Sequence, residues 1–299
     1  MNAFVSLAVL ATGAIASSCE SVCPIIFDGR VPANATVKDF DSVLGGGWNP
    51  YNPNYVKGND LLWSEIIELP DVDETSLFDT STGTRPLEVT LSDESIFQKQ
   101  YGFRRAGLQF SKDSNSGSPG SQGMVTFHFS LRLDPERPLN LSHEYLLAWH
   151  EAGDYSANQF NFNTGTLIGR EDVAEPDTYK LLNRGEELLW ETKIVEGEWQ
   201  NFGITLDFDK NTIAAAYSVG DSPLELALEP TPNNNGGEGQ YQFGLLKKPT
   251  GTDDVVNSGY QSSNLDEGLI YGGVFLEDSS GNCISTQGGK RKVRHRRRV

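Results

Sequence analysis

The chain has 299 residues, of which 37% are hydrophobic and 22% charged, enough to bury the core of one large domain or two average ones. Its formal net charge is −17, and residues 290–299 hold seven of its 24 Lys and Arg, which leaves 17 basic against 41 acidic side chains elsewhere. An acidic body repels nucleic acid and anionic membranes, so neither is expected as a partner. The basic run at 290–299 is expected to be a disordered tail.

The N-terminus has the pattern of a targeting segment. Residues 1–16, MNAFVSLAVLATGAIA, are apolar and end in a small-x-small motif. The run is too short to span a membrane, and no other apolar stretch approaches the roughly 18 residues that a spanning helix needs. It predicts a secretory signal peptide, and therefore a secreted, extracellular protein with one mature domain over residues 17–289. The sequons at Asn34 and Asn140 fit that route as glycosylation sites.

The chain has three cysteines, Cys19, Cys23 and Cys283. An oxidising compartment favours pairing, and a Cys23–Cys283 bond would join the first strand to the last. The alternative is that Cys19 is the true partner and Cys23 is free, and the sequence leaves both open. No cysteine has a Cys or His at ligand spacing, and the acidic cluster at 71–74 lacks the spacing of a calcium loop. No metal or cofactor is expected.

Short alternating runs, separated by Gly, Pro, Asn and Asp, recur along the chain. The clearest is MVTFHFSLRL (124–133), in which every second side chain from Val125 to Leu133 is apolar. QNFGITLDF (200–208) and QYQFGLL (240–246) alternate in the same way, and GLIYGGVFLE (268–277) is expected to be the closing strand. No convincing helical pattern is present. This organisation predicts an all-β fold, a jelly-roll sandwich of two antiparallel sheets.

The richest run in chemical terms begins with EYLLAWHE (144–151). Strand alternation predicts that Tyr145, Leu147, Trp149 and Glu151 share one face, with His150 on the other as a packing residue. A carboxylate two residues from a tryptophan suits a sugar cleft, because an indole stacks on a pyranose and can raise the pKa of a nearby acid. The alternative is that the indole packs in the core and the acid faces water.

The next strand, NQFNFN (158–163), alternates amides with phenylalanines. Gln159, Asn161 and Asn163 are expected on one face, opposite Phe160 and Phe162. Amides donate and accept hydrogen bonds together, which suits the hydroxyls of a neutral polyol. The alternative is that these amides only face solvent.

The chain resembles the fungal glycoside hydrolase family 131 domain in seven blocks that run in order through nearly the whole mature region: CPIIFDGRV (23–31), FRRAGL (103–108), RPLNLSHEY (137–145), NQFNFNTGTLIG (158–169), WQNFGITLDFD (199–209), FGLLKKPTG (243–251) and EGLIYGGVFLEDSSGNCIS (267–285). The resemblance implies a β-jelly roll with an open cleft and action on β-glucans with β-1,3, β-1,6 and β-1,4 bonds in cell walls. It also implies an inverting mechanism that uses two glutamates and a nearby histidine.

Residue by residue, this chain departs from the catalytic pattern that the resemblance implies. One glutamate falls on Glu151, in AWHEAGDY. The other belongs to an Arg-Arg-x-Glu-Leu motif that here reads RRAGL, so Gly107 stands where the acid is expected, and Arg105 lies on the same strand face. The histidine of the QYxFG strand is replaced by Gln242. An inverting hydrolase needs an acid and a base roughly 6.5–9.5 Å apart, so the missing carboxylate bears directly on activity.

Two functions therefore remain open. In the first, the chain is a monomeric β-glucan hydrolase with Glu151 as a catalytic residue and a second acid elsewhere, for which Glu94 of LSDESIF is one candidate. In the second, it is a catalytically impaired relative that binds β-glucan. Both predict the same substrate contacts: Arg105, Tyr145, Trp149, Gln159, Asn161 and Gln242.

Two weaker features also leave alternatives. The loop GGGWNPYNPNYVKG (45–58) brings Trp48, Tyr51 and Tyr55 together, either as an outer sugar subsite or as a loop pinned by its own aromatics. Arg104, on the strand face opposite Arg105, is expected to make a structural ion pair.

Overall fold

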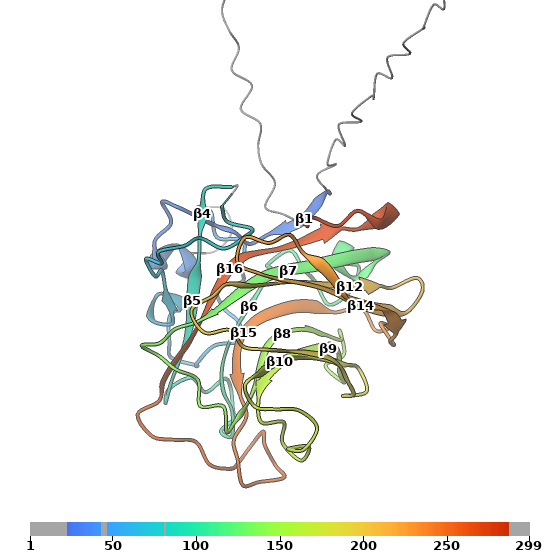
Figure 1. Ribbon diagram of the computed structural model, residues 1–299. Coiled ribbons are helices and arrows are strands. Elements are labelled where there is room, and N and C mark those ends of the chain that lie inside the picture. The colour runs from blue at the N-terminus through green and yellow to red at the C-terminus, as the bar shows by residue number, and fades with distance from the viewer. Residues whose placement is uncertain (1–22, 43–46, 81, 287–299) are drawn as a thin grey trace, which may run out of the picture.

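The computed structural model describes residues 23–42, 47–80 and 82–286. Two antiparallel sheets, one of eight strands and one of six, are stacked in layers (Figure 1), and β2 and β4 form a separate two-stranded ribbon. The described segments contain no α-helix, only 3-10 turns at Val37–Asp41, Trp63–Glu65, Pro119–Ser121 and Ser280–Asn282. The predicted all-β sandwich is confirmed.

The eight-stranded sheet has the order β14-β13-β12-β7-β16-β5-β3, with β1 paired to β16, and the six-stranded sheet has the order β11-β10-β9-β8-β15-β6. The strands are β1 Ile25–Asp28, β2 Val31–Pro32, β3 Ile67–Glu68, β4 Thr84–Arg85, β5 Leu87–Ser92, β6 Arg104–Gln109, β7 Met124–Leu133, β8 Glu144–Glu151, β9 Asn158–Gly165, β10 Thr178–Asn183, β11 Leu188–Lys193, β12 Gln200–Asp207, β13 Thr212–Val219, β14 Glu225–Pro232, β15 Gln240–Lys247 and β16 Asp266–Asp278.

The main core lies between the two sheets and is built by the alternating runs. Rings from both sheets interlock there: Phe129 of β7 meets Phe162 of β9 edge-on, with ring centroids 5.2 Å apart. Burying such a side chain contributes about 2–3 kcal/mol. Most of the inward residues predicted on the three clearest strands are buried as expected: Val125, Phe127, Phe129, Leu131, Phe202, Ile204, Leu206, Tyr241, Phe243 and Leu245. Leu133 and Phe208, at the ends of their runs, are half-buried and pack against the core.

The first and last strands are joined covalently as well as by pairing. β1 pairs antiparallel with β16, which brings Cys23, just before β1, to Cys283, just after β16. The two cysteines form a disulfide that links positions 260 residues apart. Of the two pairings that the sequence left open, Cys23–Cys283 is therefore confirmed. Cys19, the expected signal peptide and the basic tail lie outside the described residues. Within the described ranges, no helix is long and apolar enough to cross a membrane.

A β-bulge in β8 changes which of its side chains share a face. The register of β8 against β9 shifts after Leu146, and one extra residue reverses the alternation. Tyr145 and Leu147 both point into the main core, whereas Leu146 and Trp149 belong to a second apolar cluster. The expectation that Tyr145 and Leu147 share a face with Trp149 and Glu151 is therefore wrong. We call the face of the six-stranded sheet that points away from the eight-stranded sheet its outer face.

Candidate active site

Glu151 is the last residue of β8, and its half-buried side chain lies on the outer face. Gln242 of β15 lies opposite Trp149, and its Nε2 donates to Glu151 Oε2 at 2.7 Å. No described residue hydrogen-bonds the other oxygen, Oε1. One oxygen of the carboxylate is thus held in place, and the other is left for a ligand.

The space beside Gly107, where the family resemblance expects a second acid, is filled from two sides. A Cβ at Gly107 would lie 3.2 Å from Trp149 Cη2, 3.4 Å from Val56 Cγ1 and 3.4 Å from Gln242 Oε1. That Gln242 oxygen is buried without a hydrogen-bond partner. The amide of Gln242 therefore spans the distance from Glu151 to the space at Gly107, and the indole occupies part of the volume that a glutamate would need.

Trp149 is not an open platform for a sugar ring. Its side chain is only 2% exposed and packs with Phe103, Leu146 and Leu246. Val255, from the long connection between β15 and β16, covers this cluster. The predicted stacking role is wrong, and the alternative of a packed indole holds, because a distant segment folds over this half of the outer face.

Arg105 lies beside the same cluster, on the face predicted for it. Its guanidinium donates to Gln100 Oε1 at 3.1 Å and stands over the rings of Phe97 and Trp149, 5.6 Å and 5.9 Å from their centroids. Burial lowers the pKa of Arg105 to about 10, and the negative charge of Glu151 opposes that decrease. The positive charge of Arg105 therefore acts on Glu151 through a mostly apolar region, which includes the ring of Trp149.

A second carboxylate, which the sequence pattern did not single out, lies across the outer face from Glu151. Asn158 is opposite Glu151 in the register, and its Nδ2 donates to Asn161 Oδ1 at 2.5 Å. Asn161 Nδ2 in turn donates to Glu186 Oε1 at 2.6 Å, and Arg170 Nη2 lies 3.3 Å from Glu186 Oε2. These residues form a polar row from β8 across β9 to the turn between β10 and β11.

Gln159 does not belong to this row. The pairing of β8 with β9 shifts again between His150 and Glu151, and Gln159 is the extra residue on β9. Its side chain is fully buried: Oε1 accepts from His150 Nδ1 at 2.8 Å, and Nε2 donates to the carbonyls of Gly236 and Glu238. The expectation that it contacts substrate is wrong, because a second bulge turns it inward.

His150 is buried and hydrogen-bonded, as the prediction of a packing role requires. Because the Gln159 amide donates to two carbonyls, its oxygen must face His150, and the imidazole carries its proton on Nδ1. Nε2 lies 3.2 Å from Ser121 Oγ. Burial lowers the pKa of His150 to about 4, so the folded protein holds the neutral ring.

This buried ring predicts a loss of stability in acid. The unfolded chain binds a proton at His150 near pH 6.5, whereas the folded chain resists it down to about pH 4, so the contribution is complete above pH 6.5 and is lost as the pH falls. The loss reaches about 3 kcal/mol at pH 4. Urea unfolding at pH 7 and pH 4.5 should show a smaller pH dependence in His150→Gln than in the wild type.

The wild type must be compared with His150→Gln because a second buried group, Asp113, changes the free energy of unfolding with pH in the opposite direction. Burial raises the pKa of Asp113 from 3.8 to about 6. The contribution of Asp113 to the stability of the folded protein is therefore complete in acid and is lost as the pH rises through this range. Asp113 is present in both proteins, so the difference between them isolates the ring. An identical pH dependence in both would contradict the assignment.

The remaining predicted contacts lie away from the row. Tyr145 is fully buried, and its hydroxyl donates to Glu267 Oε2 at 2.8 Å, so its expected substrate contact is wrong. Tyr51 is also buried and donates to the Gly29 carbonyl, which favours a loop pinned by its own aromatics. Glu94 lies exposed in the turn after β5.

Arg104 is half-buried and donates to the carbonyls of Tyr101 and Phe103. No ion pair within 4.0 Å joins it to another described residue, so the expected structural ion pair is wrong, although its role is structural.

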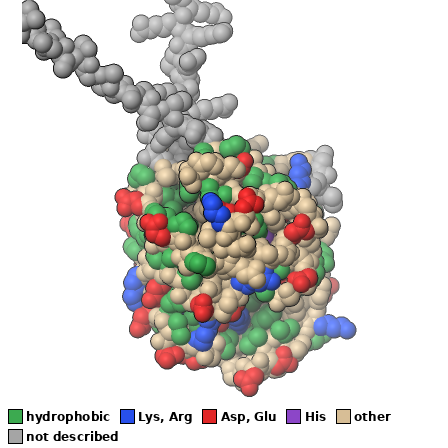
Figure 2. All heavy atoms as spheres, turned by 90° about the vertical axis from the view of Figure 1, so that its right-hand side faces the viewer, with side chains coloured by type: hydrophobic (Ala, Val, Ile, Leu, Met, Phe, Trp, Pro, Cys, Tyr) green, Lys and Arg blue, Asp and Glu red, His purple; other side chains and the backbone are tan. Residues whose placement is uncertain are grey.

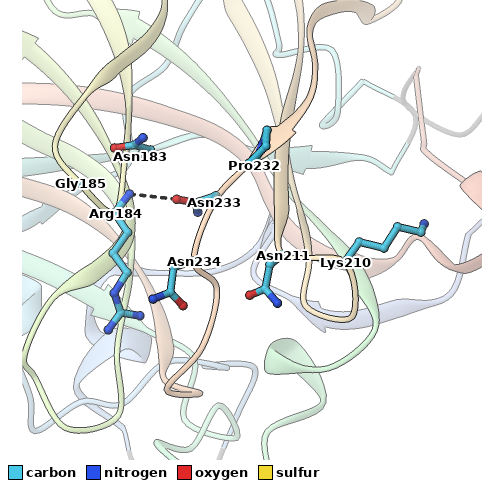
Figure 3. Close-up of a pocket in the computed structure, with 8 residues that line it drawn as sticks. All are labelled: Asn183, Arg184, Gly185, Lys210, Asn211, Pro232, Asn233 and Asn234. Atoms are coloured by element: carbon cyan, nitrogen blue, oxygen red, sulfur yellow. Dashed lines mark hydrogen bonds between the residues drawn. The ribbon is translucent and has the colours of Figure 1, made fainter.

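A surface hollow of about 770 Å³ adjoins the turn that carries Glu186 (Figure 3). Three turns meet there, and Arg184 N donates to Asn233 Oδ1 at 3.0 Å. Its lining is rich in amides and cations: Asn183, Arg184, Gly185, Lys210, Asn211, Pro232, Asn233 and Asn234. On the face that Figure 2 shows, acidic side chains are scattered rather than gathered into one patch.

Carboxylates and amides in a row across one sheet face are the side chains that carbohydrate-active proteins use to bind hydroxyls and to cleave glycosidic bonds. The model of the glycoside hydrolase 131 catalytic N-terminal domain matches residues 25–282. The chain belongs to this family. The resemblance noted in the sequence is thereby confirmed.

Two solved structures share the fold. The catalytic domain of a family 131 β-glucanase from Podospora anserina superposes with a TM-score of 0.71 at 22% identity, covering 89% of this chain and 99% of that one. The catalytic domain of a family 131 protein from Coprinopsis cinerea gives 0.67 at 20% identity, with 88% and 97% covered. A search of curated protein sequences gave no significant match.

Proposed function

We propose that the protein is a secreted hydrolase of β-glucans, with β-1,3, β-1,6 and β-1,4 bonds as substrates, that acts in cell-wall polysaccharide degradation by an inverting acid–base mechanism. The observation that carries the proposal is the placement of Glu151, on the outer face with one oxygen held by Gln242 and the other available. Membership of a glycoside hydrolase family supports it, and the Podospora anserina relative is described as a β-glucanase.

In this mechanism Glu151 acts as the general acid. Its available oxygen gives a proton to the glycosidic oxygen as the C1–O bond breaks, and a water attacks from the opposite side of the sugar ring. Gln242 and Asn161 are nearly buried, and each is bonded to a carboxylate, so both serve as positioning residues rather than as open sugar contacts.

Secretion is part of the proposal. The 1–16 segment has the pattern of a signal peptide, and the Cys23–Cys283 disulfide is typical of oxidising compartments. Asn34 and Asn140 are both exposed, as glycosylation requires. Both remain predicted glycosylation sites.

The test is the release of reducing ends from a panel of β-1,3, β-1,6 and β-1,4 glucans by the purified protein. Release from at least one of them, with chain shortening seen by size exclusion, is expected. No release from any of them over a day at pH 4 to 8 would contradict the proposal.

A second candidate function, glucan binding without catalysis, is favoured by the filled space at Gly107. In that case the wild type binds β-glucan in affinity electrophoresis and releases no reducing ends. Activity should then appear in Gly107→Glu/Gln242→His, provided that the indole of Trp149 moves aside. Gly107→Ala serves as the control for crowding alone.

A further inference from the structure

We propose that Glu186 is the second catalytic carboxylate of this enzyme and acts as the general base opposite Glu151. The inference rests on the proposed function and deepens it. The family resemblance expects the second carboxylate at Gly107. Glu186 lies on the opposite side of Glu151 from that position.

The sheet order gives Glu186 a spacing from Glu151 that suits an inverting pair. β9 and β10 lie on one side of β8, and β15 and β6 lie on the other. Glu186 is the third residue after the end of β10, so about two strand spacings separate its backbone from β8, the same number that separates β6 from β8. Neighbouring strands are about 4.8 Å apart, which puts the backbones about 10 Å apart. Inverting carboxylates lie roughly 6.5–9.5 Å apart, a range open to two carboxyl groups whose backbones are about 10 Å apart.

The two sides of Glu151 also differ in access. On the Gly107 side, Trp149 and Val56 fill the outer face. On the other side, the Glu186 side chain is 49% exposed, and Asn158, between the two glutamates, is half-buried. A sugar ring and a water molecule therefore have room on the β9–β10 side, over the amides of the polar row.

Glu186 is held in one orientation despite its exposure. Asn161, which is only 3% exposed, donates to Oε1, and Arg170 approaches Oε2 and also donates to the Glu186 carbonyl. The turn itself is fixed by the bond from Arg184 N to Asn233 Oδ1 (Figure 3). A catalytic carboxylate needs this kind of support, because misplacement by about 1 Å can cost 10²-fold in rate.

The pattern of donors assigns the roles. Each oxygen of Glu186 accepts a hydrogen bond, one from Asn161 and one from Arg170. This arrangement suits an ionised carboxylate, which is the form that can take a proton from water. Glu186 takes a proton from the attacking water, whose oxygen bonds to C1. The C1–O bond to the leaving sugar breaks with its electron pair, and the leaving oxygen takes the proton of Glu151.

The experiment compares Glu186→Gln, Glu151→Gln and Glu187→Gln with the wild type on β-glucan and on 2,4-dinitrophenyl β-cellobioside. Dinitrophenolate leaves without a proton, so loss of the acid matters little there, whereas loss of the base matters on both substrates. Glu186→Gln should lose about 10²–10⁴-fold on both. Glu151→Gln should lose activity on glucan and retain most of it on the aryl glycoside.

Glu187→Gln is the matched control, because Glu187 lies in the same turn but accepts from Asn183 Nδ2 instead of facing the row. It should keep wild-type activity. Sodium azide should restore turnover to Glu186→Ala by forming the α-glycosyl azide, a result that a merely structural role would not give. Thermal midpoints of all variants verify folding.

Wild-type activity with an unimpaired Glu186→Gln would overturn the assignment and leave the proposed function standing. Loss in Glu186→Gln on glucan alone, with the aryl glycoside still cleaved, would overturn the role as base. A wild type that cleaves neither substrate would instead refute the proposed function, before any variant is compared.

Discussion

Replacing Glu151 by glutamine is expected to lower β-glucan hydrolysis by about 10²–10⁴-fold, the usual contribution of a general acid or base. Glutamine has the same shape and can still accept from Gln242 Nε2, which donates to Glu151 Oε2 at 2.7 Å. The change therefore removes the transferable proton and the charge while the local packing is kept. Initial rates of reducing-end release, measured at substrate concentrations far below KM, report the loss directly.

Glu94→Gln is the control for this result, because Glu94 is an acidic side chain exposed in a turn after β5. It should leave the rate unchanged, which would also remove Glu94 as the second acid. Equal rates for the wild type and Glu151→Gln would contradict the account, and so would a large loss in Glu94→Gln.

Removing the disulfide should have the largest effect on stability. The Cys23–Cys283 bond links positions 260 residues apart and thereby restricts nearly the whole unfolded chain. In Cys23→Ser/Cys283→Ser, the free energy of unfolding should fall by about 4 kcal/mol, because the unfolded state gains chain entropy. Urea denaturation followed by tryptophan fluorescence, without reductant, measures this difference.

Cys19→Ser provides the control for that experiment and should unfold at the wild-type urea midpoint. A destabilised Cys19→Ser beside a single variant Cys23→Ser that keeps the wild-type midpoint would show that the pairing of Cys19 with Cys283, which the sequence also allows, is the one formed in solution.

The strands of the core were predictable because their signal is local. A strand with one buried face must place an apolar side chain at every second position, and β7, β12 and β15 do so without interruption from Val125, Phe202 and Tyr241 onward. The signal needs no knowledge of the partner strand. The fold class followed from these runs and their turns.

The misplaced site residues have a different origin. Tyr145 and Gln159 lie next to bulges, where an extra residue reverses the alternation, and a bulge is a property of two paired strands rather than of one sequence run. Both side chains therefore point inward, against the prediction. The alternation that predicted the core correctly gave the wrong face at these two points.

Two other features depend on segments far away in the chain. Trp149 is buried because Val255, about a hundred residues later, covers its cluster. Glu186 reaches the outer face because the β10–β11 turn brings it to Asn161, a contact that no spacing within NRGEE (183–187) reveals. Local patterns could identify Glu151 as a candidate, but they could not locate its partner.

The most direct test of the central claim is proton NMR of the first product that the wild type releases from β-glucan. An acid and a base on opposite sides of the scissile bond invert the anomeric centre, so the α-anomer should appear first and mutarotate afterwards to the β-anomer. Initial release of the β-anomer would contradict the account, since it requires a covalent intermediate and a closer pair of carboxylates. No product at all would contradict it as well.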